Sequence, residues 1–146
     1  MTLAKKHESE GQKQTRMETA ILFPEGLPAF ETHHRFLLVA NEEEAPFLWL
    51  YSQNNPQLAF IMIDPFLIHS HYLPDIPDED IQTLQIESDK EVFILSLVNI
   101  QNSPEPLITA NLISPIVINW RKKIAKQVIL VNHQHYSIKH RLEPAK

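Results

Sequence analysis

The sequence contains no cysteine and only two glycines among its 146 residues. Without cysteine the chain cannot form a disulfide, a thiolate zinc site or a cysteine nucleophile, which fits a reducing compartment. With glycine only at positions 11 and 26, no glycine-rich loop can cradle a phosphate group. The GxSxG motif of hydrolases and the HExxH motif of metalloproteases are also missing. We therefore expect a protein that is not an enzyme and that uses no cofactor.

Long apolar runs are missing as well. No segment approaches the roughly 20 apolar residues that a membrane-spanning helix needs, and the lysines near the start are not followed by the apolar run of a signal peptide. We therefore expect a cytoplasmic protein without a membrane partner. The chain has 146 residues, of which 43% are hydrophobic, and this is enough for one domain that buries about two thirds of its unfolded surface.

Basic residues are scarce through the middle of the chain. Residues 17–110 contain two Lys or Arg against fifteen Asp or Glu, whereas residues 111–146 contain seven against one. An acidic body repels nucleic acid and attracts a cationic protein surface. The charge pattern therefore favours a protein partner over direct contact with nucleic acid.

Short apolar runs make up most of the remaining sequence, and they have the length of β-strands. Residues 1–17 contain almost no large apolar side chain, so we expect them to be mobile. Residues 18–141 form the predicted domain, and residues 142–146 form a short tail. The predicted strands are 36–40, 47–52, 58–64, 92–100, 107–113, 116–120 and 127–131.

The connections and the apolar pattern favour a curved or closed sheet. QNNPQ at 53–57 and QNSPEP at 101–106 are typical of β connections, because Asn, Ser and Pro form turns without glycine. The runs at 58–63 and 92–100 are apolar on both alternating faces, which indicates strands covered on two sides. We predict a mainly β protein, a single small antiparallel β-barrel-like domain with one or two short helices. The clearest helix is 77–86, whose first turn is acidic.

Gly26 lies within FPEGLPAF at residues 23–30 and raises the question of why glycine is used there. Pro24 fixes the backbone angle required at the second position of a type I turn, which puts Gly26 at the favoured fourth position. The proline that follows Leu27 pushes Leu27 towards an extended backbone. We predict a joint that redirects the chain into the next strand. The side chains expected to pin it to the core are Phe23, Leu27 and Phe30.

Two histidine pairs have a spacing that metal ligands on a strand would need. His69 with His71, and His133 with His135, would place both rings of a pair on one face of an extended segment. A metal-binding protein that uses these pairs is therefore one alternative. Since no sequence feature brings the two pairs together, exposed loop histidines are the simpler interpretation, and we expect no metal.

The basic clusters RKKIAK at 121–126 and IKHR at 138–141 support a second alternative, a small β-barrel that binds nucleic acid. Against it stand the acidic body and the lack of aromatic residues interleaved with the basic ones. A turn with solvated lysines is the simpler interpretation of these clusters.

Three segments stand out when they are taken in order, namely ILFPEGLPAFE at 21–31, LAFIMIDPFL at 58–67 and ITANLISPIVINWRKKIAKQVIL at 108–130. Together they resemble the flagellar assembly factor FliW family. The resemblance extends from about residue 11 to residue 140. The first strand of the family pattern falls on the polar sequence QKQTRMET at 12–19.

Single residues also depart from the family pattern. Ala29 replaces its second glycine, and Ser114 replaces an alanine. Pro77 stands where a serine would cap the helix, so Asp78 or Asp75 is expected to cap it instead.

The resemblance implies a non-enzymatic bacterial regulator with two protein partners. Such a protein binds newly made flagellin, and it also binds the RNA-binding translational repressor CsrA. Once flagellin has been exported, the freed regulator captures CsrA and relieves the repression of flagellin translation. The acidic body predicted above suits a partner that itself holds RNA.

Five residues are candidates for partner binding, namely Glu25, Asp64, Phe66, Asn111 and Asn119. Asp64 and Phe66 end a strand at a turn, where Phe66 either anchors a partner or joins the core. Asn111 and Asn119 interrupt apolar runs, so each amide must find partners. Those partners are backbone groups across a bulge at Pro115 or groups of another protein.

Overall fold

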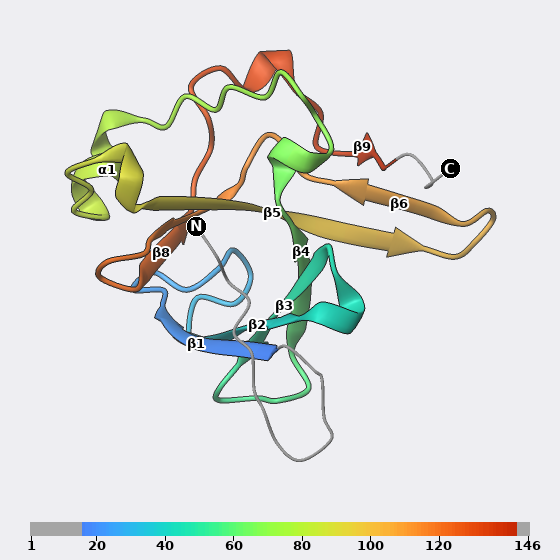
Figure 1. The fold of residues 1–146 in the computed structure, drawn as a ribbon, viewed down its shortest axis with the longest axis horizontal. Coiled ribbons are helices and arrows are strands. Elements are labelled where there is room, and N and C mark those ends of the chain that lie inside the picture. Colours follow the sequence, from blue (N-terminus) through green and yellow to red (C-terminus); the bar gives the residue numbers. More distant parts are fainter. Residues whose placement is uncertain (1–15, 143–146) are drawn as a thin grey trace.

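The computed structural model describes residues 16–142, which form a closed β-barrel with a second layer over one side (Figure 1). The strands are β1 (Arg16–Leu22), β2 (Arg35–Asn41), β3 (Phe47–Ser52), β4 (Ala59–Ile63), β5 (Val92–Gln101), β6 (Leu107–Ala110), β7 (Ile116–Asn119), β8 (Ile124–Gln127) and β9 (His140–Arg141). The helices are α1 (Asp78–Thr83) and four 3-10 turns, η1 (Glu42–Glu44), η2 (Pro65–Leu67), η3 (Asp89–Glu91) and η4 (His133–His135). The mainly β class is confirmed.

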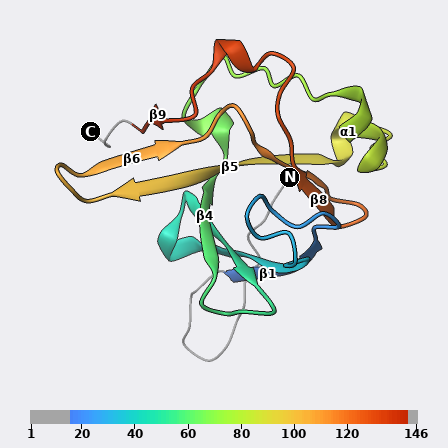
Figure 2. The same cartoon turned by 180° about the vertical axis from the view of Figure 1, so that it is seen from behind.

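Seven strands close the barrel in the order β4-β3-β2-β1-β8-β7-β5, and β5 pairs back to β4. The pairings are antiparallel except that of β1 with β8, where Leu22 lies opposite Ile124. Closure leaves these seven strands with neighbours on both sides, which protects them from pairing with other chains. β6 and β9 continue the sheet, and Figures 1 and 2 show the β5–β6 hairpin projecting beyond the barrel.

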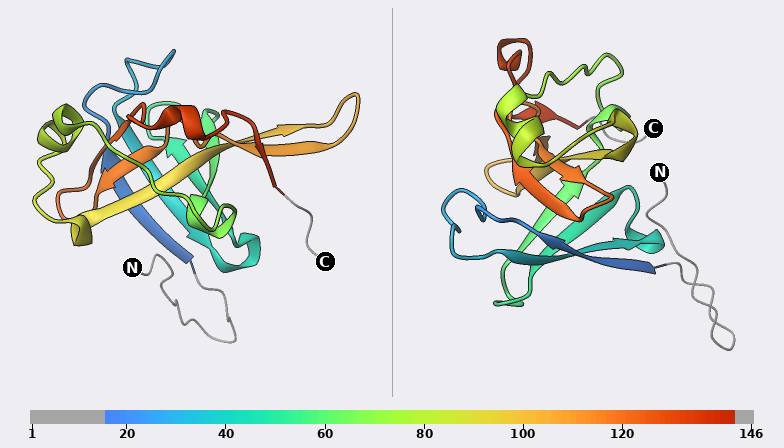
Figure 3. Two further views of the ribbon diagram at one scale, coloured as in Figure 1. Left: turned by 90° about the horizontal axis from the view of Figure 1, so that it is seen from above. Right: turned by 90° about the vertical axis from the view of Figure 1, so that its left-hand side faces the viewer.

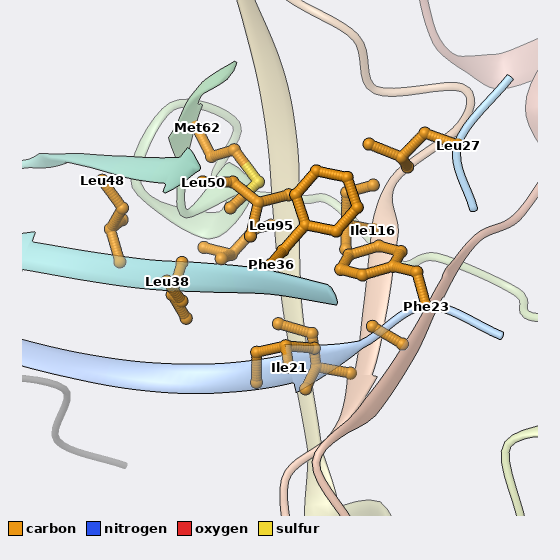
Figure 4. Packing of buried hydrophobic residues seen from close by; sticks show 12 residues of the cluster. Ile21, Phe23, Leu27, Phe36, Leu38, Leu48, Leu50, Met62, Leu95 and Ile116 are labelled. Carbon is orange, nitrogen blue, oxygen red and sulfur yellow. The ribbon is translucent and has the colours of Figure 1, made fainter. Parts of the chain in front are cut away.

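Alternate side chains of the barrel strands fill its interior. Along β3 half-buried and buried residues alternate strictly, so that Leu48 and Leu50 face inward. Phe23 and Phe36 meet edge to face there, with ring centroids 4.9 Å apart. Figure 4 shows these side chains converging with Leu95 of β5. Burial of such side chains contributes about 1.5 to 3 kcal/mol each.

Coverage on both faces was predicted for the runs 58–63 and 92–100, which correspond to β4 and β5. The structure shows it along β5 and at the end of β4, where two consecutive residues are buried, and also on β7, for which it was not predicted. On β7, Ile116 and Ile118 belong to the barrel interior, whereas Val117 belongs to a second cluster with Tyr72 and Leu84. β5 is divided in the same way between these two clusters. Figure 3 shows α1 and the connecting segments on the side of β5 and β7 away from β1 and β2.

The N-terminal strand begins within the segment expected to be mobile. Arg16 and Met17 lie in β1, which pairs with β2 over seven residues from Arg16↔Asn41 to Leu22↔Arg35. Strand pairing uses backbone groups, so only the alternate inward side chains need to be apolar. Residues 1–15 of that segment and residues 143–146 of the expected tail lie outside the described residues.

The strand predicted at 127–131 is wrong in its position. β8 is Ile124–Gln127, because Lys123 has φ +59° and reverses the chain directly after β7. Beyond Gln127 the backbone still bonds through Val128 N to Pro115 O and Leu130 N to Ile113 O. These hydrogen bonds run to the turn between β6 and β7 rather than to a strand, so residues after Gln127 do not continue the regular β-ladder.

The helix is shorter than predicted, and the expected cap is wrong. Pro77 occupies the N-cap position of α1, and within the described chain no side chain caps the helix, neither Asp78 nor Asp75. Acidic residues still crowd the first turn, where the helix dipole favours them. The helix ends before Gln85, whose φ is +56°.

Candidate partner-binding surface

The joint at FPEGLPAF has the predicted turn. Gly26 N donates to Phe23 O at 2.9 Å, which closes the four-residue turn, and Gly26 has φ +68°. A Cβ on Gly26 would lie 2.7 Å from the backbone of Glu31, so this position excludes any side chain. Phe23 and Leu27 are buried and Phe30 packs against the same cluster, as predicted. The glycine is therefore explained by backbone geometry and close packing.

Glu25 is exposed on this joint and faces the helix across β8. Its carboxylate lies 3.6 Å from Lys126 Nζ, which also donates to Asp80 Oδ1 at 2.5 Å. The hydrogen bond to Asp80 raises the pKa of Lys126, and desolvation opposes this effect. Lys126 is thus tied to two carboxylates, so it is not one of the solvated lysines expected in RKKIAK.

Asp64 and Phe66 stand at the end of β4, where the chain enters the second layer. The Asp64 carboxylate caps η2 by accepting from Phe66 N at 2.9 Å. Phe66 is 49% exposed, and its ring meets Tyr72 edge to face at a centroid distance of 5.6 Å. Half of the Phe66 ring is therefore available to another molecule.

Asn119 is fully buried, and its bonds run to backbone groups. Its Nδ2 donates to Leu84 O at 2.8 Å and to Gln85 O at 3.1 Å, while its Oδ1 accepts from Lys122 N at 3.2 Å. Asn119 therefore fastens the end of α1 to the turn between β7 and β8. The Asn111 carboxamide oxygen likewise accepts from Ile113 N and Ser114 N, each at 3.0 Å, and shapes the turn after β6.

An open groove lies between the segment after β4 and the segment that joins α1 to β5. It encloses about 540 Å³, and Asp64 and Phe66 both line it. Its floor is apolar and comes from both segments, through Pro74, Ile76, Ile81, Ile86, Val92, Phe93 and Ile94. The remaining lining residues are Glu87, Ser88 and Asp89. Two of the five candidates, which are also close in sequence, therefore line this groove. Glu25 and Asn119 do not line it, and they are linked to the region of α1 through Lys126 and through the carbonyls at the end of the helix.

The wall of this groove is held by hydrogen bonds to the chain that follows β8. Asn132 Oδ1 accepts from Asp75 N at 3.0 Å, and its Nδ2 donates to Leu73 O at 2.8 Å. Tyr136 accepts from Leu73 N, and the buried Tyr72 hydroxyl donates to Leu112 O, both at 2.8 Å. Burial raises the pKa of Tyr72. These bonds fix an extended segment that has little regular structure of its own.

The histidine pairs lie in the second layer. His69 Nδ1 accepts from His71 N, so this pair is joined within one turn, and His133 and His135 are exposed in η4. The His69 ring meets His140 at a centroid distance of 5.5 Å. Among residues 16–142 no group of three or more His, Cys, Asp or Glu side chains could hold a metal ion.

The basic residues of the cluster RKKIAK at 121–126 make several local contacts. Arg121 donates from Nε to Glu91 Oε1 at 2.6 Å, and Lys122 donates to Gln85 Oε1 at 2.6 Å. Lys123 lies over the Trp120 ring and donates to the Trp120 carbonyl. These contacts attach the β7–β8 turn to the segment around α1.

Residue-by-residue reasoning missed most of the groove. Glu87 and Asp89 stand in an ordinary acidic stretch, and Ile81 falls with Leu84 on one face of the short predicted helix. The spacing of Asp64 and Phe66 at a strand end was the one available signal. The opposing wall comes from residues more than ten positions away in sequence, so their proximity is a tertiary result.

The comparison with known families decides what kind of protein has this architecture. The family model described as FliW protein matches residues 5–142, which is nearly the whole chain. The chain belongs to the FliW family. The predicted resemblance is therefore confirmed.

Curated relatives in the FliW family match over most of both chains. The flagellar assembly factor FliW of Thermoanaerobacter pseudethanolicus is 42% identical over 124 residues, covering 84% of this chain and 81% of its own. The protein of the same name from Geobacillus kaustophilus is 36% identical over 146 residues, covering all of this chain and 98% of its own. A crystal structure of the flagellar assembly factor FliW aligns with a TM-score of 0.75 at 38% identity, covering 86% of each chain.

One departure from the FliW sequence pattern has a backbone consequence. Ala29 stands where the resemblance implies a glycine, and it adopts φ +73° beside the exposed Glu31, whose carboxylate accepts from Ala29 N at 3.1 Å. This left-handed backbone costs about 1 kcal/mol for a residue with a Cβ.

Within residues 16–142 the longest α-helix is far too short to cross a bilayer, and no helix meets the requirements of a membrane span.

Proposed function

We propose that this chain is a cytoplasmic, non-enzymatic regulator of flagellar assembly that binds flagellin and the translational repressor CsrA in turn. Membership of the FliW family over residues 5–142 is the observation that carries the proposal, together with relatives named flagellar assembly factor. Binding of one partner excludes binding of the other, so the amount of free flagellin sets how much CsrA is captured.

The surface chemistry supports a protein that recognises other proteins. Phe66 is half exposed beside an apolar groove, and the ionisable groups that line this groove are carboxylates. Half-exposed aromatic side chains next to apolar hollows are typical anchors of protein interfaces. We assign direct contact to Glu25, Asp64 and Phe66, and we assign to Asn111 and Asn119 the role of holding the loops that present them.

Size-exclusion chromatography of mixtures tests the proposal. We expect the purified protein to comigrate with flagellin and, in a separate run, with CsrA. When all three proteins are mixed, we expect flagellin to displace CsrA from the complex. A third mixture contains the protein and RNA. Comigration with RNA but with neither protein would favour the alternative function, a small β-barrel that binds nucleic acid. Failure to bind either protein would overturn the proposal.

A charge reversal at Glu25 tests whether the joint faces a partner. Glu25→Lys should weaken binding of at least one partner by about ten-fold, because it replaces an attraction by a repulsion at the interface. Glu44→Lys, in the exposed turn η1, is the matched control and should leave both affinities within about two-fold. Equal effects of the two variants would remove Glu25 from the contact surface.

A further inference from the structure

The groove between η2 and the α1–β5 connection combines an apolar floor with a rim of one charge sign. Ile81 and Ile86 contribute to the floor, and the exposed half of Phe66 forms one edge. The ionisable residues among those that line it are Asp64, Glu87 and Asp89. Among the described residues no lysine, arginine or histidine lines this groove.

The carboxylates at the rim differ in their hydrogen bonds, in their neighbouring cations and in their exposure to solvent. The Asp64 carboxylate caps η2, so its charge is held in place at the groove edge. Glu87 lies 3.8 Å from Arg121, which partly offsets its charge, although the Glu87 side chain is 77% exposed. Asp89 is exposed in η3 and lines the groove, whereas its neighbour Lys90 is not among the lining residues. The field at the mouth of the groove is therefore negative.

We infer that this groove binds a segment of a partner protein in which a bulky apolar side chain is flanked by lysine or arginine. The apolar side chain enters the floor beside Phe66, and the flanking cations meet Asp64 and Asp89. An apolar floor without charges would accept any hydrophobic segment, so the rim supplies the selectivity.

This inference deepens the proposed function and rests on it for the identity of the partner. Of the two proposed partners, the RNA-binding repressor must present cations to hold phosphate groups, and it is the one whose chemistry fits an acidic rim. A second hollow, between η2 and the β5–β6 hairpin, gives an internal contrast, since Arg141 is the ionisable residue among those that line it.

Fluorescence anisotropy with a designed peptide tests the groove without either natural partner. The probe is a short labelled peptide with one phenylalanine between two lysines on each side. We expect saturable binding that weakens as salt screens the rim charges. Replacing the lysines by glutamates should abolish binding, and replacing the phenylalanine by serine should weaken it about ten-fold.

Protein variants locate the binding site. Asp89→Lys should weaken the peptide about ten-fold at low salt, and Phe66→Ser should weaken it by a similar factor. Glu44→Lys and Arg141→Glu, which lie outside the groove, should change the affinity less than about two-fold. Melting curves of every variant establish that it is folded, and Asp89→Lys replaces an exposed side chain that the fold does not require.

Three outcomes would overturn the inference. The first is failure of the folded protein to bind the peptide, and the second is an equal loss of affinity in Glu44→Lys and Asp89→Lys. The third is a dimer of the protein alone that Asp89→Lys dissociates, because the occupant would then be a second copy. If the peptide binds as expected but neither flagellin nor CsrA comigrates, the groove chemistry stands and the regulatory function fails.

Discussion

Two buried serines on barrel strands show how much a single hydroxyl group matters. Ser52 at the end of β3 is 2% exposed, and its Oγ shares hydrogen bonds with His33 Nδ1 at 2.9 Å and with the backbone N atoms of Asn54 and Asn55 at 3.3 Å each. Ser96 on β5 is 0% exposed, and its Oγ has no partner among the described residues. A buried hydroxyl without a partner keeps its desolvation cost.

Replacing these serines by alanine should therefore have opposite effects. Ser96→Ala should raise the free energy of unfolding by about 1 kcal/mol, because the unpaired hydroxyl is removed. Ser52→Ala should lower it by about 2 kcal/mol, because three donors or acceptors lose their partner. Urea denaturation of both variants measures these changes. Destabilisation of the Ser96 variant by as much as the Ser52 variant would show that Ser96 has a partner in solution.

At the same scale, residue identity points to one of the four left-handed backbone positions among the described residues and gives no signal for the other three. Gly26 was predictable because glycine tolerates positive φ. Ala29, Gln85 and Lys123 also have positive φ, but residues with a Cβ normally avoid that region. Their conformations are imposed by the elements on either side, so the residue types give no signal.

At the scale of elements, α1 is too short to be stable alone and depends on its attachment to the barrel. Asn119 bonds to two carbonyls at the end of this helix and to one amide of the β7–β8 turn. Lys126 of β8 holds the first turn through Asp80. The helix is therefore positioned by two side chains of the neighbouring strands.

Removal of the Asn119 side chain should loosen this attachment. Asn119→Ala should lower the free energy of unfolding by about 3 kcal/mol, because three buried hydrogen bonds are lost, and amide exchange in α1 should accelerate. Asn132→Ala, which loses two bonds at a more exposed site, is the matched control and should cost about 1 kcal/mol. Equal losses, with α1 amides unchanged, would contradict the role assigned to Asn119.

The elements themselves were mostly predictable, and their ends were not. The run that became β3 was predicted at its observed bounds, 47–52, because it is an apolar and aromatic run of strand length between polar segments. β6 ends at Ala110 rather than at the predicted residue 113, because the Asn111 side chain turns the chain. A polar residue that ends a strand by bonding to the backbone after it cannot be told in sequence from a polar residue within a strand. Each is a single polar residue in an apolar run.

At the scale of the whole molecule, ion pairs connect the segment before β5 to the β7–β8 turn. Arg121 bonds to Glu91, which also accepts from Glu87 N at 2.9 Å. These hydrogen bonds, that from Glu87 N first and that from Arg121 second, lower the pKa of Glu91. The pKa of Arg121 is raised by the same contact.

This lowered pKa makes part of the stability depend on pH. Because the folded-state pKa of Glu91 lies below its unfolded value of about 4.3, its contribution is present above that pH. The contribution is lost as the pH falls through the folded-state value. Melting temperatures should therefore separate wild type from Glu91→Gln at neutral pH and converge in more acidic buffer. Glu44→Gln, in the exposed turn η1, is the control, and a constant gap for Glu91→Gln would contradict the ion pair.

The sequence by itself determined the strand composition, the two-sided burial of β5, the turn at Gly26 and the family. These features follow from the order of residue types along short stretches, where side-chain period and turn chemistry act locally. Only the tertiary structure decided which polar groups meet. Asn119 reaches the end of α1, Lys126 reaches Asp80, and Phe66 and Ile86 line one groove, because closure of the barrel brings distant segments together. No local rule encodes such pairings, since each depends on how every other strand has closed.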